Sequence, residues 1–206
     1  MNTVQPIRNR EKLEDLKDEL KKNGTRDYML FYTGINSGMR VSDIVVLKKD
    51  DIRNSDGSMK QHITVTEKKT GKQKKFPLCN GLLAEMEGYT KNMKTGEYLF
   101  KSRKGENKPI TTVQAYRIIS EAAKKIGLCE IGTHTMRKTF GYFHYQQYKD
   151  VAILQAILNH SSPSVTLRYI GINQDIIDNS YMNFRLWKKQ KNYSVRLLFC
   201  KKYCIV

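Results

Sequence analysis

Residues 158–171 read LNHSSPSVTLRYIG, and the interpretation of the whole chain starts from this stretch. An apolar helical pattern leads into it, and Asn159 is suited to end that helix in the left-handed conformation. Ser162, followed by a proline, is typical of the cap and first residue of another helix. His160 therefore lies in the joint between two helices, and Tyr169 lies about two turns, roughly 10 Å, into the second one.

The histidine and tyrosine of this stretch do not by themselves indicate chemistry. A tyrosine on a helix most often packs against its neighbours, with its hydroxyl satisfied by a hydrogen bond. A catalytic role requires that other parts of the chain bring charged or acid–base groups to the same place.

The charge of the chain indicates a polyanionic partner. Its 206 residues include 37 that are lysine or arginine and 20 that are aspartate or glutamate, so the formal net charge is +17. The hydrophobic fraction of 39% and the aromatic fraction of 10% are typical of a globular protein. Because no clean basic amphipathic helix favours a membrane surface, nucleic acid is the expected partner.

The sequence predicts neither export nor a cofactor. No run approaches the roughly 18 apolar residues of a membrane span, and the N-terminus lacks the apolar core of a signal peptide. We therefore expect a cytoplasmic protein. The cysteines lack zinc-ligand spacing, so we expect free thiols and no metal. They are Cys79, Cys129, Cys200 and Cys204.

Hydrophobic periodicity predicts an α+β fold that is mainly α, with a small antiparallel β-hairpin inserted early. The hairpin is expected from the alternation in residues 61–67 and a returning segment at residues 74–78, and residues 97–100 are a candidate further strand. Helical patterns cover residues 10–24, 26–38, 41–52, 80–93, 111–127, 133–147, 150–158, 162–170 and 173–184.

Two of these helices carry more detailed expectations. Ser42 is a candidate N-cap for the third helix. The helix over residues 111–127 is expected to be amphipathic through a stripe of Val113, Tyr116, Ile119 and Ala123. We expect one domain over residues 1–185 and a tail over residues 186–206 that is a docking segment or disordered.

A second polar motif, GTHTMRKTF, lies at residues 132–140. His134 and Arg137 are three positions apart and therefore share one face of a helix. Thr133 is a candidate N-cap, which would place both side chains in the first turn, where the helix dipole favours an anion. Taken alone, the pair is also compatible with a solvated helix surface.

Arg40 and Lys69 are further candidates. Arg40 lies at the mouth of a helix after two glycines that allow close approach of the backbone, and a guanidinium there can hold two phosphate oxygens at once. Asp43, three positions later, is a candidate partner for it. Lys69 lies at the tip of the hairpin, where most lysines are simply hydrated.

Taken together, these motifs resemble the catalytic domain of the tyrosine recombinases, the family of phage and transposon integrases. The resemblance is carried by SGMRVSDIVVLKKDDI, KKTGKQKKFPL, THTMRKTF and LNHSSPSVTLRYIGI, which occur in the family's order. It covers roughly residues 25–184. Any one of the motifs is weak, but their order and the nine-residue step from His160 to Tyr169 are specific.

The resemblance implies a role for each candidate residue in cutting and rejoining double-stranded DNA. Tyr169 would attack the phosphate and form a 3′-phosphotyrosyl intermediate. Two arginines and one histidine would hold the phosphate, a lysine would protonate the leaving 5′-oxygen, and a second histidine would assist proton transfer or orient the phosphate. In that order, these residues are Arg40, Arg137, His160, Lys69 and His134.

Several alternatives stay open at this point. Lys68 and Lys72 flank Lys69, and a shift of one residue in the hairpin would exchange their faces; both are expected to contact DNA. A recombinase-derived protein that binds DNA without cutting it, or an isolated catalytic fragment with weak activity, is the alternative function. A type IB topoisomerase shares the chemistry but resembles the chain less.

The resemblance also carries expectations about assembly. Family members commonly have an N-terminal DNA-clamping domain, for which there is no room before Arg40. The chain is therefore expected to be either a catalytic fragment or a short, single-domain recombinase like the fimbrial inversion enzymes. On DNA, self-association into a tetrameric synapse is expected. In the family a C-terminal segment often docks on a neighbouring protomer, and the stripe of Ile177, Tyr181 and Phe184 suits either that contact or packing within the chain.

Overall fold

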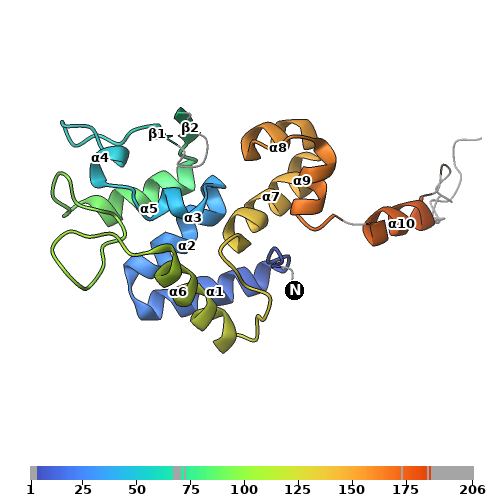
Figure 1. The fold of residues 1–206 in the computed structure, drawn as a ribbon, viewed down its shortest axis with the longest axis horizontal. Helices are drawn as coiled ribbons and strands as arrows, with labels where there is room; N and C mark the ends of the chain where they lie inside the picture. Colours follow the sequence, from blue (N-terminus) through green and yellow to red (C-terminus); the bar gives the residue numbers. More distant parts are fainter. Residues whose placement is uncertain (1–3, 67–70, 72, 173, 185, 187–206) are drawn as a thin grey trace, which may run out of the picture. The chain divides into compact units, whose positions relative to one another are not determined.

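The computed structural model describes residues 4–66, 71, 73–172, 174–184 and 186. Its contacts divide the chain into two compact units, Met1–Ile172 and Asn173–Val206. The first unit is mainly helical and carries one small two-stranded sheet, as the sequence predicts (Figure 1). In the described part of the chain, no helix combines the length and apolarity needed to cross a bilayer.

The first two helices, α1 (Arg10–Asn23) and α2 (Thr25–Ser37), pack against each other. The Asn9 side chain caps α1 by accepting hydrogen bonds from its first turn, and Leu16 and Leu20 bury one face. Gly24 separates the helices with a φ of 123°, a value that residues other than glycine rarely adopt. The helix end predicted near this glycine is confirmed.

The third predicted helix is wrong in its extent and in its cap. The chain forms a four-residue α3 (Val41–Ile44), capped by Arg40 and not by Ser42, and later a four-residue α4 (Lys49–Ile52). The helix cannot continue because residues 47–49 exchange backbone hydrogen bonds with residues 97–99. This exchange is an isolated bridge, so the strand expected at residues 97–100 is also wrong.

The predicted hairpin consists of β1 (His62–Thr66) and β2 (Gln73–Pro77), paired in antiparallel register. Ile63 pairs with Phe76, and both side chains are buried in the main core. Because successive side chains of a strand alternate between its faces, this pair fixes the register of the hairpin.

Helices α5 (Asn80–Thr90) and α6 (Thr112–Lys125) complete the main core around α2. Thr111 and Gln114 form a capping box at the start of α6. The predicted stripe of α6 is partly wrong, because Val113 and Tyr116 are 55% and 40% exposed. The buried face consists of three alanines, which allow close packing, and one isoleucine: Ala115, Ala122, Ala123 and Ile119.

The last three helices of the first unit are α7 (Thr135–Tyr148), α8 (Val151–Leu158) and α9 (Pro163–Tyr169), which lie together in Figure 1. The predicted caps are confirmed: Asn159 ends α8 in the left-handed conformation, and the Ser162 hydroxyl caps α9. A small apolar cluster of Leu154, Leu158 and Ile170 joins α8 and α9.

The second unit contains α10 (Gln174–Asn183). Ile177, Tyr181 and Phe184, which form the stripe predicted from the sequence, are exposed. The predicted tail, residues 186–206, lies outside the described residues except for Leu186.

Candidate active site

Arg40 is placed by a sharp turn at the end of α2. Gly38 ends that helix with a φ of 64°, and a Cβ atom on it would lie 2.5 Å from the Phe140 ring of α7. Only glycine therefore allows the chain to turn this close to α7. The turn leaves Arg40 in extended conformation, directly before α3 and beside the helix that carries Arg137.

Arg137, in the first turns of α7, hydrogen-bonds to the turn after α2 and to the end of α8. Its side chain is almost fully buried, and its residue is 3% exposed. One terminal nitrogen donates to the Gly38 carbonyl at 2.5 Å, and the other donates to the Leu158 carbonyl at 2.6 Å. The guanidinium is thereby held between the turn that carries Arg40 and the joint that carries His160.

The sequence predicts His134 as the first residue of its helix, after a Thr133 cap, but α7 begins one residue later. The cap of α7 is His134 itself, with a φ of −99° and a ψ of −4°, and the expectation for Thr133 is wrong. The reason is local: the Thr135 hydroxyl accepts a hydrogen bond from the Gly132 amide at 2.9 Å, and so supports the turn from inside the helix. His134 Nδ1 lies 3.3 Å from Tyr169 Oη.

His160 and Tyr169 are in contact, although their spacing did not require it. Their ring centroids are 4.8 Å apart, and the rings meet edge to face at 69°. His160 Nδ1 lies 3.1 Å from the Thr166 hydroxyl, and Gln155 donates to the His160 carbonyl. These contacts fix both the imidazole and the loop beneath it.

The surroundings of His160 and Tyr169 favour the neutral form of both rings. Burial lowers the pKa of His160, and the positive charges of Arg137, Arg40 and Lys74 lower it further. Burial raises the pKa of Tyr169, while Arg137 and Arg40 act in the opposite direction.

The lysines of the hairpin turn, Lys68, Lys69 and Lys72, lie outside the described residues. The strands on either side hold another lysine that the sequence analysis missed. Lys74 donates from β2 to the Ile157 carbonyl at the end of α8, and its ammonium lies 5.2 Å from the Phe76 ring. The alternation of the strand could have identified Lys74 from the sequence, because Lys74 and the buried Phe76 lie on the same face of β2.

Asp43 is 2% exposed and accepts a hydrogen bond from the Ser42 hydroxyl at 3.3 Å. Its burial close to Arg40 in the chain is compatible with the predicted partnership. That partnership with Arg40 stays a prediction.

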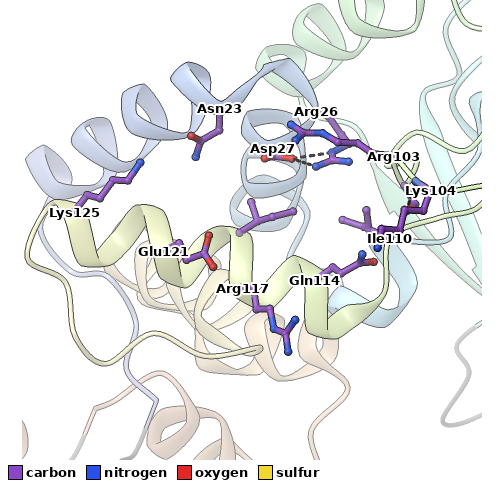
Figure 2. Close-up of a pocket in the computed structure, with 12 residues that line it drawn as sticks. Asn23, Arg26, Asp27, Arg103, Lys104, Ile110, Gln114, Arg117, Glu121 and Lys125 are labelled. Atoms are coloured by element: carbon purple, nitrogen blue, oxygen red, sulfur yellow. Dashed lines mark hydrogen bonds and ion pairs between the residues drawn. The ribbon is translucent and has the colours of Figure 1, made fainter.

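A separate cavity of about 460 Å³ lies between α2, α6 and residues 102–110 (Figure 2). It contains a partly buried ion pair in which Arg26 Nη2 lies 2.7 Å from Asp27 Oδ1. Of the predicted catalytic side chains that the structure describes, none lines this cavity. His134, Arg137, His160 and Tyr169 come together instead where α7, α8 and α9 meet.

Known proteins match this chain over most of its length. The phage integrase family matches residues 9–175. The probable integrase/recombinase YoeC of Bacillus subtilis is 52% identical over 184 residues, which cover 89% of this chain and 98% of YoeC. Tyrosine recombinase XerA of Pyrococcus furiosus is 29% identical over 164 residues, which cover 79% of this chain and only 56% of that longer protein.

Solved structures show the same fold. A crystal structure of XerA recombinase matches with a TM-score of 0.70 at 21% identity, covering 90% of this chain and 66% of that one. A lambda integrase dimer bound to a core site matches with a TM-score of 0.64 at 18% identity, covering 92% of this chain and 64% of that one. The predicted fold class is therefore confirmed.

Proposed function

Because this chain belongs to the phage integrase family, we propose that it is a site-specific DNA recombinase whose nucleophile is Tyr169. Its similarity to YoeC over nearly all of that protein, and to the Xer recombinases over part of their length, supports strand exchange as the reaction. The proposed substrate is double-stranded DNA, and the proposed chemistry uses no metal or other cofactor.

One observation carries this proposal. The Tyr169 hydroxyl lies 3.3 Å from His134 Nδ1, its ring touches His160, and Arg40 and Arg137 act electrostatically on it. A phenol surrounded by cationic and imidazole groups is suited to attack a phosphate, because the same groups that bind the anion stabilise the charge of the transition state.

In the proposed reaction, Tyr169 Oη attacks phosphorus and forms an O–P bond while the bond from phosphorus to the 5′-oxygen breaks. The phenol proton passes to His134, and Lys69 supplies a proton to the departing 5′-oxygen. Arg40, Arg137 and His160 hold the phosphate oxygens. The product is a 3′-phosphotyrosyl bond and a free 5′-hydroxyl, and attack by the 5′-hydroxyl of another strand reverses the step.

The test is a nicked duplex from which the cleaved 5′ fragment diffuses away, so that the covalent adduct accumulates. We expect the protein to form an adduct visible by denaturing gel, and Tyr169→Phe to form none, because it lacks the attacking oxygen. Tyr148→Phe is the matched control, since Tyr148 is an exposed tyrosine of α7 and should leave the yield unchanged. An adduct with Tyr169→Phe would exclude this nucleophile, and EDTA should not affect the yield.

A second candidate function, DNA binding without cleavage, is favoured by the charge of +17 alone. It predicts tight, salt-sensitive binding to DNA with no adduct under any condition. The nicked duplex distinguishes the two functions, because only a protein that cleaves DNA forms a covalent adduct with it.

We also propose that the protein assembles as a tetramer on DNA in the cytoplasm. Each chain carries one proposed nucleophile, and exchange between two duplexes requires four strand cleavages, hence four chains. The proposed contact with a second copy is made by exposed apolar residues of α10 and the residue that follows it, namely Ile177, Tyr181 and Phe184. We expect a DNA complex with the mass of four protomers, which Tyr181→Ser combined with Phe184→Ser should reduce.

A further inference from the structure

The helix that carries Tyr169 is short, and its far end is held by a residue from the start of the chain. A helix of seven residues, such as α9, has little stability of its own. Immediately after it, the Gly171 carbonyl accepts a hydrogen bond from Arg8 Nη2 at 3.1 Å. This bond joins residues 163 positions apart.

Gly171 is fitted to this contact in two ways. Its φ of 80° lies in the left-handed region that favours glycine, and a Cβ atom on it would lie 2.4 Å from Arg8 Nη2. The Arg8 guanidinium is oriented by the Gln5 side chain, which accepts from the same nitrogen at 3.4 Å, and lies 5.8 Å from the Tyr142 ring. The Gln5 side chain and the Tyr142 ring therefore both orient the guanidinium of Arg8.

Lys138 provides a second link from the same segment to the tyrosine. Its ammonium donates to the Val4 carbonyl at 2.7 Å and lies 5.2 Å from the centroid of the Tyr169 ring. A cation in this range is attracted to the face of an aromatic ring. The Lys138 ammonium thus connects the first described residue of the chain to the phenol ring.

The segment that makes these links is itself part of the fold. The Gln5 amide donates to the Glu130 carbonyl at 3.1 Å, and the Ile7 amide donates to the Thr139 hydroxyl at 2.9 Å. Ile7 is 4% exposed and belongs to the main core. Residues 4–8 therefore have a fixed place against α7, from which they reach α9.

We propose that residues 4–8, together with Lys138, form an N-terminal clasp that positions Tyr169 for attack on the phosphate. Arg8 holds the end of α9, and Lys138 holds the ring, so both are positioning residues. This inference rests on the proposed function. The clasp acts beside His134 and His160, which contact Tyr169, and beside Arg137 and Arg40, whose positive charges act on the phenol.

The clasp should affect the rate of cleavage and leave DNA binding unchanged. A displacement of about 1 Å at a reacting group can cost on the order of 100-fold in rate. For Arg8→Ala and Lys138→Met we therefore expect adduct formation in a single turnover to slow by about 10- to 100-fold at saturating DNA, with the Kd for DNA within about two-fold of the parent value.

Two further variants make this test specific. Arg8→Lys keeps one charged donor within reach of the Gly171 carbonyl and should restore part of the rate. Arg10→Ala removes a cation that contacts the Phe143 ring of α7, but no contact to α9 is seen for it, so the rate should not change. A normal rate for Arg8→Ala, no rescue by Arg8→Lys, or an equal loss in Arg10→Ala would each overturn the clasp.

Hydrogen exchange tests the same proposal without any reaction. The Ile170 and Ile172 amides donate within α9 and its end, to Thr166 and Leu167 carbonyls. In Arg8→Ala these two amides should exchange about ten-fold faster, while those of α5 keep the parent rate. Unchanged exchange would contradict the clasp. If the parent protein forms no adduct at all, the proposed function fails, whereas normal cleavage by Arg8→Ala removes only the clasp.

Discussion

His160 and Tyr169 occupy one small space, and burial acts on the two rings in opposite directions. It lowers the pKa of the imidazole and raises that of the phenol, so burial favours the uncharged form of each ring. An uncharged pair avoids an isolated charge between two arginines. Phosphate binding would change this balance, because the anion offsets the positive charge of Arg40 and Arg137 on His160.

The lowered histidine pKa values predict how stability depends on pH. Burial lowers the pKa of His160 and also that of His144, so the unfolded chain takes up protons first as the pH falls below 6.5. The free energy of unfolding should therefore decrease as the pH falls from about 7.5 through 6.5 toward the lower pKa values of the folded state. Urea denaturation across this range measures it.

Replacing the histidines provides the control for this prediction. His160→Asn and His144→Asn should each flatten the dependence on pH, and the double variant should flatten it most. A slope that is identical in all four proteins would show that neither histidine is responsible.

At the scale of elements, the position of α9 depends on how closely α7 allows it to approach. Gly141 lies on the buried face of α7, and a Cβ atom there would lie 2.8 Å from the Cγ2 atom of Ile170. Ile170 directly follows Tyr169, so the glycine sets the distance between the helix of Arg137 and the helix of the nucleophile.

Gly141→Ala should therefore destabilise the protein and slow cleavage. Although alanine favours a helix over glycine, forcing a methyl group into a packed contact typically costs about 1–3 kcal/mol. Gly88→Ala is the matched control, because Gly88 is inside α5 with no atom within 4 Å of the new methyl group, and should stabilise by about 0.5–1 kcal/mol. A Gly141→Ala protein as stable as Gly88→Ala would refute this account.

The elements that the sequence predicted correctly are those that short-range chemistry determines. Asn159 and Ser162 were identified as the end of one helix and the cap of the next, because capping depends on residues a few positions away. The single helix expected over residues 41–52 was wrong because residues 47–49 bond to a distant segment. Thr133 was wrong because Thr135 supports the turn at the start of α7.

At the scale of the molecule, the sequence identified the order of the motifs but not every group that joins them. Arg40, Arg137, His160 and Tyr169 come from separate segments, and only resemblance to a family placed them together before the structure did. Arg8 was not recognised as a candidate, because an isolated arginine near the start of a chain carries no pattern. Its contact with Gly171 depends on tertiary structure alone.

The charge of the whole molecule leads to the last prediction. A net charge of +17 should make binding to non-specific duplex DNA steeply dependent on salt, because each phosphate that is neutralised releases counterions. With six to ten contacts, a rise from about 50 to 200 mM salt should weaken binding by about 10³- to 10⁵-fold. Fluorescence anisotropy with labelled duplex measures this slope, and Tyr169→Phe should share it, because binding precedes attack. An affinity that hardly changes over this range would refute the idea that the surface charge serves DNA binding.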